Sequence, residues 1–390
     1  MTTIEARTIL VVGAGIAGIA ASIAFRQQGH DVTLIESRTR QTLVSEGLFL
    51  TLAPNGMNAL KPLGVYERAL AAGIATTAIE LLSRKGRRLA LVNQQHYEHT
   101  YGAPSCTIIR GHLIGILLER AVEVGVHLEC GTRVEDVTLS NGVVSITCSN
   151  ETPRSFDLVI GADGIKSTIR DLIFPDAAQP TYTGQVGTGG FVDAPAADTG
   201  GIMRMTFGSQ AFFGYIAQAG KPVYWFNSFM AGPDWTQPEN GLVFAHDIRG
   251  LHNDDPEPAG AILSAVESIE RAYPIFELPR LSRWSRGNVV LIGDAAHAIG
   301  PHAGQGGSLA LEDALVLADC LSGEKDVGAA LDDYEQSRRS RVEKIASMTR
   351  RRGATKQPKT WLGMFVRDLF VTLFVSLGNK SAEKVMSFRI

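Results

Sequence analysis

Apolar residues follow two different patterns along this chain, and their order predicts an α/β fold. Ile9–Val12 and Val289–Ile292 are continuous apolar runs, as is the segment that begins at Asp157; such runs are typical of strands buried on both faces of a parallel sheet. Small apolar residues at helical spacing follow the first run as far as Arg26, and "DVTLIE" then predicts another strand ending at Glu36.

The pattern changes to alternating apolar and polar residues between Pro180 and Arg286. Segments such as "GGIMRMTFGS" and "GLVFAHDI" predict strands of an antiparallel sheet, and Ala211–Ala217 and Pro222–Phe229 predict a hairpin through "QAGK". We therefore expect an interwoven chain. One domain would take residues 1–72, 102–180 and 287–345, a second 73–101 and 181–286, and residues 346–390 would form a C-terminal helical segment.

Composition limits the class of protein. A chain of 390 residues is too long for one compact core, and 45% hydrophobic with 20% charged residues is ordinary for a globular protein. The net charge of -3 gives no support for a nucleic-acid partner. The four cysteines are widely separated, which favours reduced thiols in a cytoplasmic protein and no metal site.

Two apolar stretches resemble membrane segments without being convincing ones. Ile9–Phe25 carries glycines at fixed spacing, and the stretch from Thr360 to Gly378 is interrupted by Arg367 and Asp368. The second predicts an amphipathic helix that packs on the protein or on a partner. Association with a membrane surface is the less favoured alternative, suggested by the basic run at 350–352.

The first apolar run leads into a dinucleotide-binding fingerprint. Gly13, Gly15 and Gly18 form G-x-G-x-x-G between a predicted strand and helix, and Glu36 ends the next strand. Gly13 would permit the tight turn, Gly15 the approach of a pyrophosphate, and Gly18 close packing of helix on strand. Glu36 would accept hydrogen bonds from ribose hydroxyls, which argues against a 2′-phosphate but leaves NAD and FAD open.

Two further strand ends carry a glycine and an acid. Gly161-Ala162-Asp163-Gly164 follows one strand, with Arg170 beyond it, and Gly293-Asp294 follows another. Ligands of open parallel sheets lie outside the carboxyl ends of the strands, so three such ends plausibly converge on one long ligand. FAD is long enough to require all three.

The three motifs together resemble those of the single-component FAD-dependent aromatic hydroxylases, typified by p-hydroxybenzoate hydroxylase. They are G-x-G-x-x-G, D-x-x-x-G-A-D-G-x-x-S-x-x-R and G-D-A-A-H-x-x-x-P-x-x-G-Q-G, spread over roughly residues 8 to 345. The likeness is greatest to the salicylate, 3-hydroxybenzoate, urate and tetracycline-modifying branch. It implies a Rossmann-like FAD domain of the p-hydroxybenzoate hydroxylase (GR2) type, an inserted antiparallel-sheet substrate domain and C-terminal helices.

The resemblance also implies which residues bind the cofactor. Glu36 would hold the adenosine ribose, Arg110 would open a helix beside the cofactor, and Asp294 would lie near the ribityl chain. Two departures are Ser37, where an arginine often directly follows the acid, and Ser308, where many members have asparagine. The implied set is Gly13, Ala14, Gly15, Ile16, Ala17, Gly18, Glu36, Ser37, Arg38, Gly47, Arg110, Val134, Asp163, Gly164, Asp294, Gly304, Gln305, Gly306, Gly307 and Ser308.

By the same resemblance, NADH or NADPH would reduce FAD, and O2 would then form a C4a-hydroperoxyflavin that hydroxylates an aromatic or polycyclic, electron-rich small molecule. The N–H groups around Gly304–Gly307 would favour the anionic reduced flavin, and Pro301 would fix the loop facing flavin and substrate. The protein would be a monomer or a homodimer. Alternatives are a flavin oxidase or reductase of the same fold and a non-catalytic flavin- or ligand-binding protein.

No acid/base side chain can be assigned from the sequence. His297 is expected to tie the loop to its neighbours, and His302 is a candidate for lining the substrate pocket next to Pro301. The aromatic residues Phe213, Tyr215, Tyr224 and Phe226 could form one side of that pocket or simply a sheet core. Arg204 could anchor a polar ring substituent, although solvent exposure is favoured for it, and Tyr215 is the next candidate as a hydrogen-bond donor.

Overall fold

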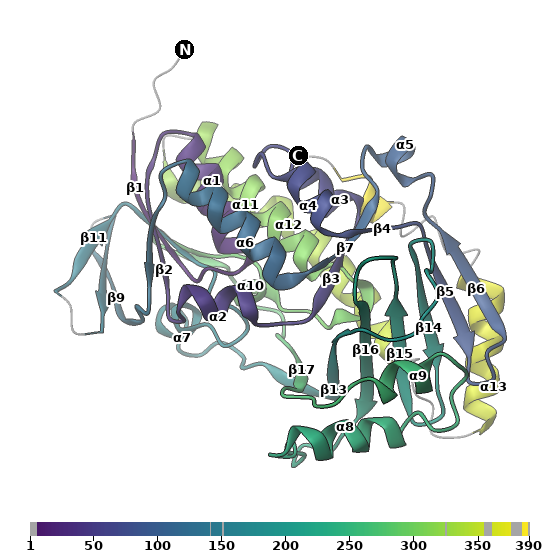
Figure 1. Ribbon diagram of the computed structural model, residues 1–390. Helices are drawn as coiled ribbons and strands as arrows, with labels where there is room; N and C mark the ends of the chain where they lie inside the picture. Colours follow the sequence, from purple (N-terminus) through teal and green to yellow (C-terminus); the bar gives the residue numbers. More distant parts are fainter. Residues whose placement is uncertain are drawn as a thin grey trace.

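The structure is a computed structural model that describes residues 6–140, 142–149, 152–323, 326–354, 361–375 and 384–388. Figure 1 shows its two parts: a sheet covered by long helices, and a second sheet with short helices on its outer face. The mixed α/β architecture predicted from the sequence is confirmed.

The first part is built on a six-stranded sheet whose central strands are parallel. The predicted apolar runs are its strands: they are wholly buried because helices or a second sheet cover both faces. Its strands, in spatial order, are β18 (Ser285–Arg286), β19 (Val289–Leu291), β12 (Leu158–Gly161), β1 (Thr8–Val12), β2 (Asp31–Glu36) and β8 (His127–Cys130).

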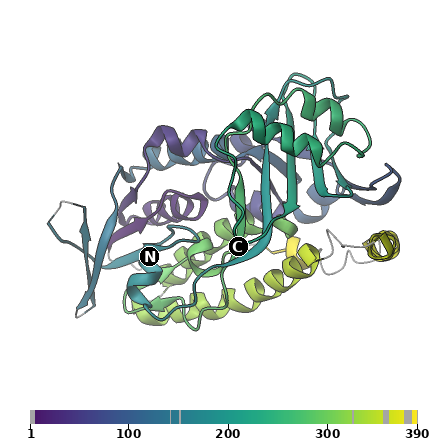
Figure 2. The ribbon, with the colours of Figure 1, turned by 90° about the horizontal axis from the view of Figure 1, so that it is seen from below.

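Helices pack against this sheet on one side, and a small antiparallel sheet covers the other (Figures 1 and 2). The alanine-rich α1 packs closely against α11 because its side chains are small. The helices are α1 (Ile16–Gln27), α2 (Arg40–Ser45), α6 (Arg110–Glu123), α7 (Thr168–Ile173), α10 (Asp294–His297), η1 (Pro301–Ala303), α11 (Gly306–Gly323) and α12 (Val327–Ala354). The small sheet consists of β9 (Val134–Ser140), β10 (Val143–Cys148) and β11 (Arg154–Phe156).

The second part is a seven-stranded sheet, and its central hairpin β15–β16 lies where the sequence predicted one. The sheet is not purely antiparallel as expected, because β14 pairs in parallel with β5, which enters from a distant part of the chain. Its strands, in spatial order, are β17 (Tyr273–Glu277), β13 (Thr181–Val192), β16 (Val223–Met230), β15 (Ala211–Ile216), β14 (Ile202–Phe207), β5 (Ala78–Ser83) and β6 (Arg88–Asn93).

A three-stranded sheet lies between the two parts (Figure 1). Its strands are β3 (Phe49–Leu52), β7 (Ser105–Ile109) and β4 (Ile74–Thr76), accompanied by α3 (Pro54–Ala59), α4 (Tyr66–Ala72) and α5 (Tyr97–Tyr101). The outer face of the seven-stranded sheet is covered by α8 (Gly241–Gly250) and α9 (Ala259–Ser264). The prediction of a strand over "GLVFAHDI" was therefore wrong: this segment is the helix α8, which packs its buried Phe244, Ala245 and Ile248 on the sheet. Phe49 on β3 contacts the other face, so this small sheet joins the two parts.

The C-terminal region follows the long helix α12. The expected boundary at residue 345 falls inside that helix, which continues without a break to Ala354. Beyond it lie α13 (Trp361–Phe370) and the π-helical turn η2 (Val371–Val375), which packs against β6. Among the residues that the structure describes, no helix has both the length and the apolarity needed to cross a membrane.

Candidate active site

The three glycines of the fingerprint lie in and just after the turn between β1 and α1, and the space around each of them differs. Gly13 has φ +103°, and a Cβ there would lie 2.6 Å from the Ala162 carbonyl oxygen. A Cβ on Gly18 would overlap the carbonyl oxygen of Gly13. Gly15 is different, because a Cβ there would meet nothing within 4 Å. Packing within the chain therefore requires Gly13 and Gly18, whereas Gly15 leaves room for a ligand.

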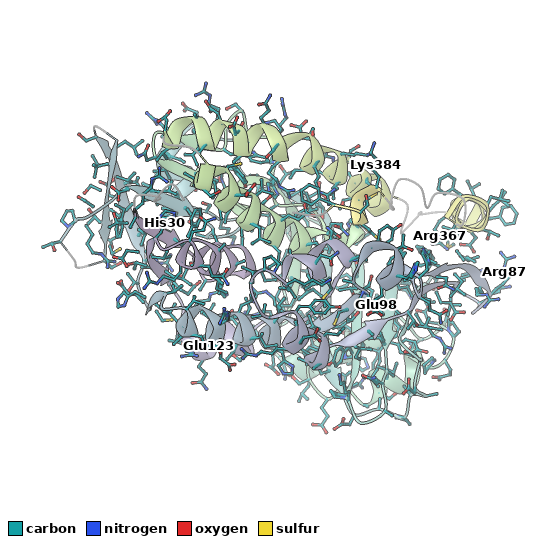
Figure 3. The ribbon with its side chains drawn as sticks, turned by 90° about the horizontal axis from the view of Figure 1, so that it is seen from above. His30, Arg87, Glu98, Glu123, Arg367 and Lys384 are labelled. Atoms are coloured by element: carbon teal, nitrogen blue, oxygen red, sulfur yellow. The ribbon has the colours of Figure 1, made fainter. Side chains whose placement is uncertain are left out.

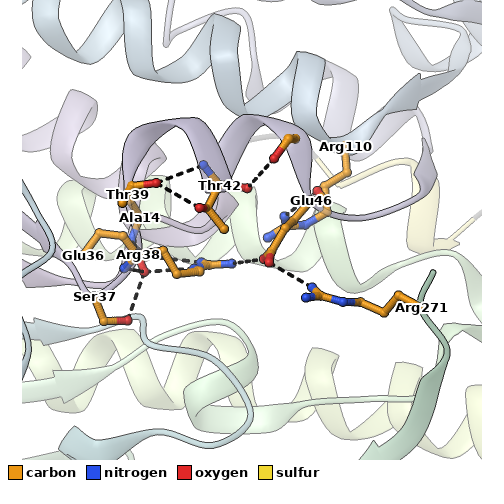
Figure 4. A network of polar contacts seen from close by, with 10 residues as sticks. Ala14, Glu36, Ser37, Arg38, Thr39, Thr42, Glu46, Arg110 and Arg271 are labelled. Carbon is orange, nitrogen blue, oxygen red and sulfur yellow. Dashed lines mark hydrogen bonds and ion pairs between the residues drawn. The ribbon is translucent and has the colours of Figure 1, made fainter. Parts of the chain in front are cut away.

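Glu36, at the end of β2, lies beside this turn and receives several hydrogen bonds (Figure 4). Its carboxylate accepts the Ala14 N–H at 2.9 Å, the Arg38 N–H at 2.9 Å and the Arg38 Nε–H at 3.0 Å. Burial alone would raise the pKa of Glu36, but these donors hold the pKa below its ordinary value. The structure thus brings the expected residues Ala14, Glu36, Ser37 and Arg38 together around one carboxylate.

A second group of charges continues from Arg38 toward the seven-stranded sheet (Figure 4). Glu46 forms ion pairs with Arg38 at 3.4 Å and with Arg271 at 2.9 Å, and its carbonyl oxygen lies 3.5 Å from Arg110 Nη1. Gly47, in the left-handed region at φ +99°, packs against the Arg110 side chain. Glu46 and Arg271 were not singled out in the sequence, because no motif marks them.

The second motif, at residues 157–170, holds neighbouring loops together. Asp163 accepts the Ser167 hydroxyl at 2.5 Å and the Ile169 N–H at 3.1 Å, so its carboxylate caps α7. Arg170 on α7 is fully buried and donates to the carbonyl oxygens of Ile165 and Ala295, at 3.0 and 3.3 Å. This arginine therefore ties the second motif to the third. Gly164, at φ +83°, faces open space.

The third motif forms a loop between α10 and α11 that lies on α1. Gly293 packs against Ala17, and Gly307 packs against Leu50 and Ile16. α11 begins at Gly306, so the N–H groups of its first turn have no partner within the helix. A Cβ on Gly306 would meet nothing within 4 Å, as at Gly15. The structure places Gly304 and Pro301 exposed on this loop, and Gln305 and Ser308 buried behind it.

Asp294 begins α10 on the same edge of the sheet as Gly13 and Glu36, because β1, β2, β12 and β19 run in parallel. Its side chain reaches solvent, yet the protein around it raises the pKa of Asp294 by desolvation, while His297 and Arg110 act in the opposite direction. The Asp294 carboxylate acts to raise the pKa of Arg110 on α6, but burial is the larger effect and lowers that pKa overall. A carboxylate and a guanidinium close enough to influence each other's pKa thus lie in this region.

A buried polar network lies behind the loop of the third motif, and it was not predicted from the sequence. Asp313 on α11 accepts the Gly293 N–H at 3.0 Å, contacts His297 Nε2 at 2.6 Å and accepts Arg338 Nε–H at 2.8 Å. Its neighbour Glu312 pairs with Arg338 at 2.7 Å. The contact between His297 and Asp313 confirms the expectation that His297 ties the loop to its surroundings. In the sequence, this network is indicated by two acidic residues, Glu312 and Asp313, within the apolar run that forms α11.

The network extends to Gln305 itself and to the C-terminal residues. Asn55 donates to Gln305 Oε1 at 3.0 Å and to Glu312 Oε1 at 2.7 Å. Arg341 binds Glu312 at 2.6 Å and the Val385 carbonyl oxygen at 2.7 Å. The loop is thus held from behind by α3, α11 and α12.

The seven-stranded sheet does not present its aromatic residues as expected. Strand alternation puts Phe213 and Tyr215 with Trp225 on the face covered by α8 and α9, and puts Tyr224 and Phe226 on the other face. The expectation that all four share one side was therefore wrong.

Arg204 also lies on the face covered by α8 and α9. It donates to the Tyr215 hydroxyl at 3.2 Å and pairs with Glu80 at 3.1 Å. The structure therefore does not bring Arg204 and Tyr215 to Pro301 and His302, although the sequence grouped these four as pocket candidates.

The opposite face carries an aromatic cluster around Phe49. The ring centroids of Tyr224, Phe226 and Phe191 lie 5.5, 6.0 and 6.3 Å from that of Phe49. Phe49 belongs to β3, whose Thr51 carbonyl oxygen lies 4.0 Å from the position of a Cβ on Gly304. The cluster therefore adjoins the third motif. Val134, also expected near the cofactor, is buried at the start of β9.

These features fit FAD. At Gly15 and Gly306 a Cβ would meet no protein atom within 4 Å, so both positions leave room for a ligand. The Glu36 carboxylate accepts the Ala14 N–H beside Gly15, and Asp294 begins α10 at the same edge of the sheet. The fold and this edge define a dinucleotide-binding α/β flavoprotein.

Comparison with known proteins identifies the class further. The family described as "FAD binding domain" matches residues 6–349, so the chain belongs to that family. The 3-amino-4-hydroxybenzoate 2-monooxygenase of Streptomyces cremeus is 31% identical over 88% of this chain and 86% of its own length. The aurachin C monooxygenase/isomerase of Stigmatella aurantiaca is 28% identical over 95% and 94%. The protein is an FAD-dependent monooxygenase.

Solved structures share the whole fold. The Klebsiella pneumoniae HpxO complexed with FAD and uric acid superimposes with a TM-score of 0.86 at 22% sequence identity, covering 97% of each chain. The Arthrobacter nicotinovorans 2,6-dihydroxypyridine-3-hydroxylase gives a TM-score of 0.76 at 20% identity, covering 90% of this chain and 93% of that one. Both confirm the fold expected from the three motifs.

Proposed function

We propose that this protein is a cytoplasmic hydroxylase of an electron-rich aromatic small molecule, using NADH or NADPH and O2. The observation that carries the proposal is the position of the aromatic cluster around Phe49, next to the Gly304 loop of the flavin motif. Bound FAD would supply the redox chemistry, namely reduction by NAD(P)H and O2 activation by the C4a-hydroperoxyflavin route. The division into an FAD domain and a substrate domain, as set out from the sequence, belongs to the same proposal.

The residues of the chain would hold and orient the cofactor. Gly15 would admit the pyrophosphate beside the N-terminus of α1, and Glu36 would accept ribose hydroxyls. Asp294 would accept hydroxyls of the ribityl chain. The free N–H groups of the first turn of α11 would favour negative charge on the reduced flavin.

The substrate class follows from the lining of the cluster. Phe49, Phe191, Tyr224 and Phe226 offer flat apolar surfaces, with the Tyr224 hydroxyl as the polar group among them. Burial raises the pKa of Tyr224, which keeps that hydroxyl protonated as a hydrogen-bond donor. A planar aromatic ring with one hydrogen-bonding substituent fits such a surface. Two relatives are named for compounds with planar rings and polar substituents, 3-amino-4-hydroxybenzoate and 2-heptyl-3-hydroxy-4(1H)-quinolone.

The test of the function is substrate-dependent oxygen incorporation. The purified yellow protein is incubated with NADH or NADPH and a panel of hydroxybenzoates, aminobenzoates and quinolones. We expect at least one compound to accelerate NAD(P)H oxidation and to acquire label from ¹⁸O2. Acceleration with hydrogen peroxide as the sole oxygen product would support a flavin oxidase instead. Tight binding of a compound with no NAD(P)H oxidation would support a binding protein.

Substitution of Tyr224 by Phe tests the side of the sheet that faces substrate. We expect kcat/KM to fall by roughly tenfold, because the variant keeps the ring but removes one buried hydrogen-bond donor. Tyr215→Phe is the matched control; it removes the bond to Arg204 on the far face and should leave kcat/KM within about twofold. The reverse order of effects would place the substrate on the α8–α9 side.

Substitution of Asp294 by Ala tests the cofactor assignment. We expect the Kd for FAD to rise by roughly tenfold or more, since at least one charged acceptor of the ribityl chain is lost. Titration of the apoprotein by flavin fluorescence measures this change. Asp319→Ala, on an exposed position of α11, is the control and should bind FAD normally. Unchanged FAD binding by Asp294→Ala would mean that the third motif is not part of the cofactor site.

A further inference from the structure

The helix α13 has its apolar residues on the outside. Phe365, Val366, Leu369, Phe370 and Leu373, the last on η2, are 49–61% exposed. Their spacing places them on one side of the helix, over less than half of its circumference. Exposed apolar patches of this kind mark surfaces that bind a partner or a membrane.

The inner side of the same helix carries a buried charge beside an apolar anchor. Arg367 is buried, with its guanidinium 4.6 Å from the centre of the Phe207 ring and 2.7 Å from the Asp368 carboxylate. Val371 is the anchor and packs with Leu89 and Phe212. The cation–π contact and the ion pair let a charged residue face the protein, and this arrangement turns the large apolar residues outward.

A basic hairpin lies at the same end of the molecule. The turn between β5 and β6 carries Arg84, Lys85, Arg87 and Arg88, all exposed. In the described part of the chain the side chains of Arg84, Lys85 and Arg87 form no ion pair with an acid, and Arg88 lies 3.9 Å from Glu80. β6 leads from this turn to the residues under η2, and Figures 1 and 3 show the hairpin beside α13, with Arg87 labelled.

We propose that this surface, α13–η2 together with the β5–β6 hairpin, docks the enzyme on an anionic lipid bilayer. Four cations in one turn of a chain whose net charge is -3 are complementary to a negative surface. Large apolar residues beside them would enter the boundary between headgroups and acyl chains, as in amphipathic helices that lie in the membrane plane. The exposed apolar side of α13 differs from the expectation that this helix packs on the protein, whereas the alternative expectation of packing on a partner is not tested. Residues 360 and 376–378 of the predicted stretch lie outside the described residues.

A second copy of the chain fits this surface less well. A two-fold interface through α13 would apply the same apolar and basic patch from both copies, so it would offer each hairpin no surface of opposite charge. A bilayer with anionic headgroups satisfies the hairpin and the helix together. The docking proposal does not depend on the identity of the substrate.

The experiment measures sedimentation of the FAD-loaded full-length protein with vesicles. Vesicles of phosphatidylcholine alone are compared with vesicles that also contain the anionic lipid phosphatidylglycerol, because polybasic surfaces are attracted by anionic headgroups. We expect binding to the anionic vesicles only, with release by salt. Arg84→Ser/Arg87→Ser should weaken it by roughly 25-fold, about fivefold for each charge. Phe365→Ser/Phe370→Ser should abolish it.

Matched variants control for charge and apolarity in general. Arg280→Ser/Arg283→Ser removes two exposed cations elsewhere, and Leu242→Ser/Val243→Ser removes two exposed apolar residues of α8. Both should bind like the parent, and flavin content and circular dichroism verify folding of every variant. Three results would overturn the proposal: no binding of the parent to either vesicle, equal losses in the controls, or a dimer that Phe365→Ser/Phe370→Ser dissociates while vesicles bind nothing.

Discussion

Gly15→Ala is expected to fold like the parent protein but to lose FAD. A Cβ at this position meets no protein atom within 4 Å, and the backbone φ of -79° is one that alanine adopts easily. The methyl group would instead occupy the approach of the pyrophosphate to the N-terminus of α1. We expect the Kd for FAD to rise by at least about a hundredfold, roughly 2.7 kcal/mol. Fluorescence titration of the apoprotein measures it, and urea unfolding of the apoprotein should be unchanged.

Gly18→Ala is the matched comparison, since it adds the same methyl group three residues later. Here the Cβ would overlap the Gly13 carbonyl oxygen, so α1 must move away from β1. The apoprotein should lose about 3 kcal/mol of unfolding free energy, with FAD binding lost as a consequence. If Gly15→Ala lowered the unfolding free energy of the apoprotein as much as Gly18→Ala does, the first motif would be a structural turn, and its assignment as a ligand site would be wrong.

Asp313→Asn is expected to have the largest effect on stability outside the fingerprint. Burial raises the pKa of Asp313, but His297 and Arg338 prevail and lower it from 3.8 to about 2. Replacing the carboxylate leaves the buried guanidinium of Arg338 paired with one acid, Glu312, and weakens the bonds to Gly293 and His297. Loss of one member of a buried charge network costs about 3–5 kcal/mol of unfolding free energy.

The pH dependence of this contribution has a definite sign. Because the folded-state pKa is lower than the ordinary value, the carboxylate stabilises the folded protein fully above pH 3.8, and this stabilisation is lost as the pH falls toward about 2. Asp313→Asn should therefore unfold in less urea at pH 7, and its stability should fall less than that of the parent below pH 4. Asp319→Asn, on an exposed position of the same helix, should match the parent at every pH. A neutral result at Asp313 would mean that the loop is held by other contacts.

The local motifs were predictable because each one is fixed by neighbours in sequence. The strands before Gly13 and Gly293 were recognisable from apolar runs, and the parallel order of the sheet follows from the helices between them. The strand face that meets the cofactor domain was not predictable. A change of one residue exchanges the two faces, so Tyr215 and Tyr224 differ in role through the register of β15 with β16.

Polar contacts between residues that lie far apart in the sequence could not be predicted either. Asp313 on α11 binds Arg338 on α12, and Glu46 binds Arg271, which lies just before β17. No spacing rule relates such residues, because the contact depends on how α11, α12 and β17 pack. An acid inside an apolar helical run indicates only that some partner is buried with it.

The network behind the third motif also sets an order of assembly during synthesis. Gly13–Gly18 leave the ribosome first, but their strand pairs with β12, which in turn pairs with β19 near residue 290. The loop from Gly293 to Ser308 is held by Arg338 and by Glu312, which Arg341 also binds, so it cannot be complete until α12 has emerged. A nascent chain therefore contains the turn at Gly13–Gly18 long before the loop from Gly293 to Ser308 is complete. If both segments hold FAD, as proposed, cofactor capture is an event of the nearly finished polypeptide, and a chain truncated before residue 338 should accumulate without flavin.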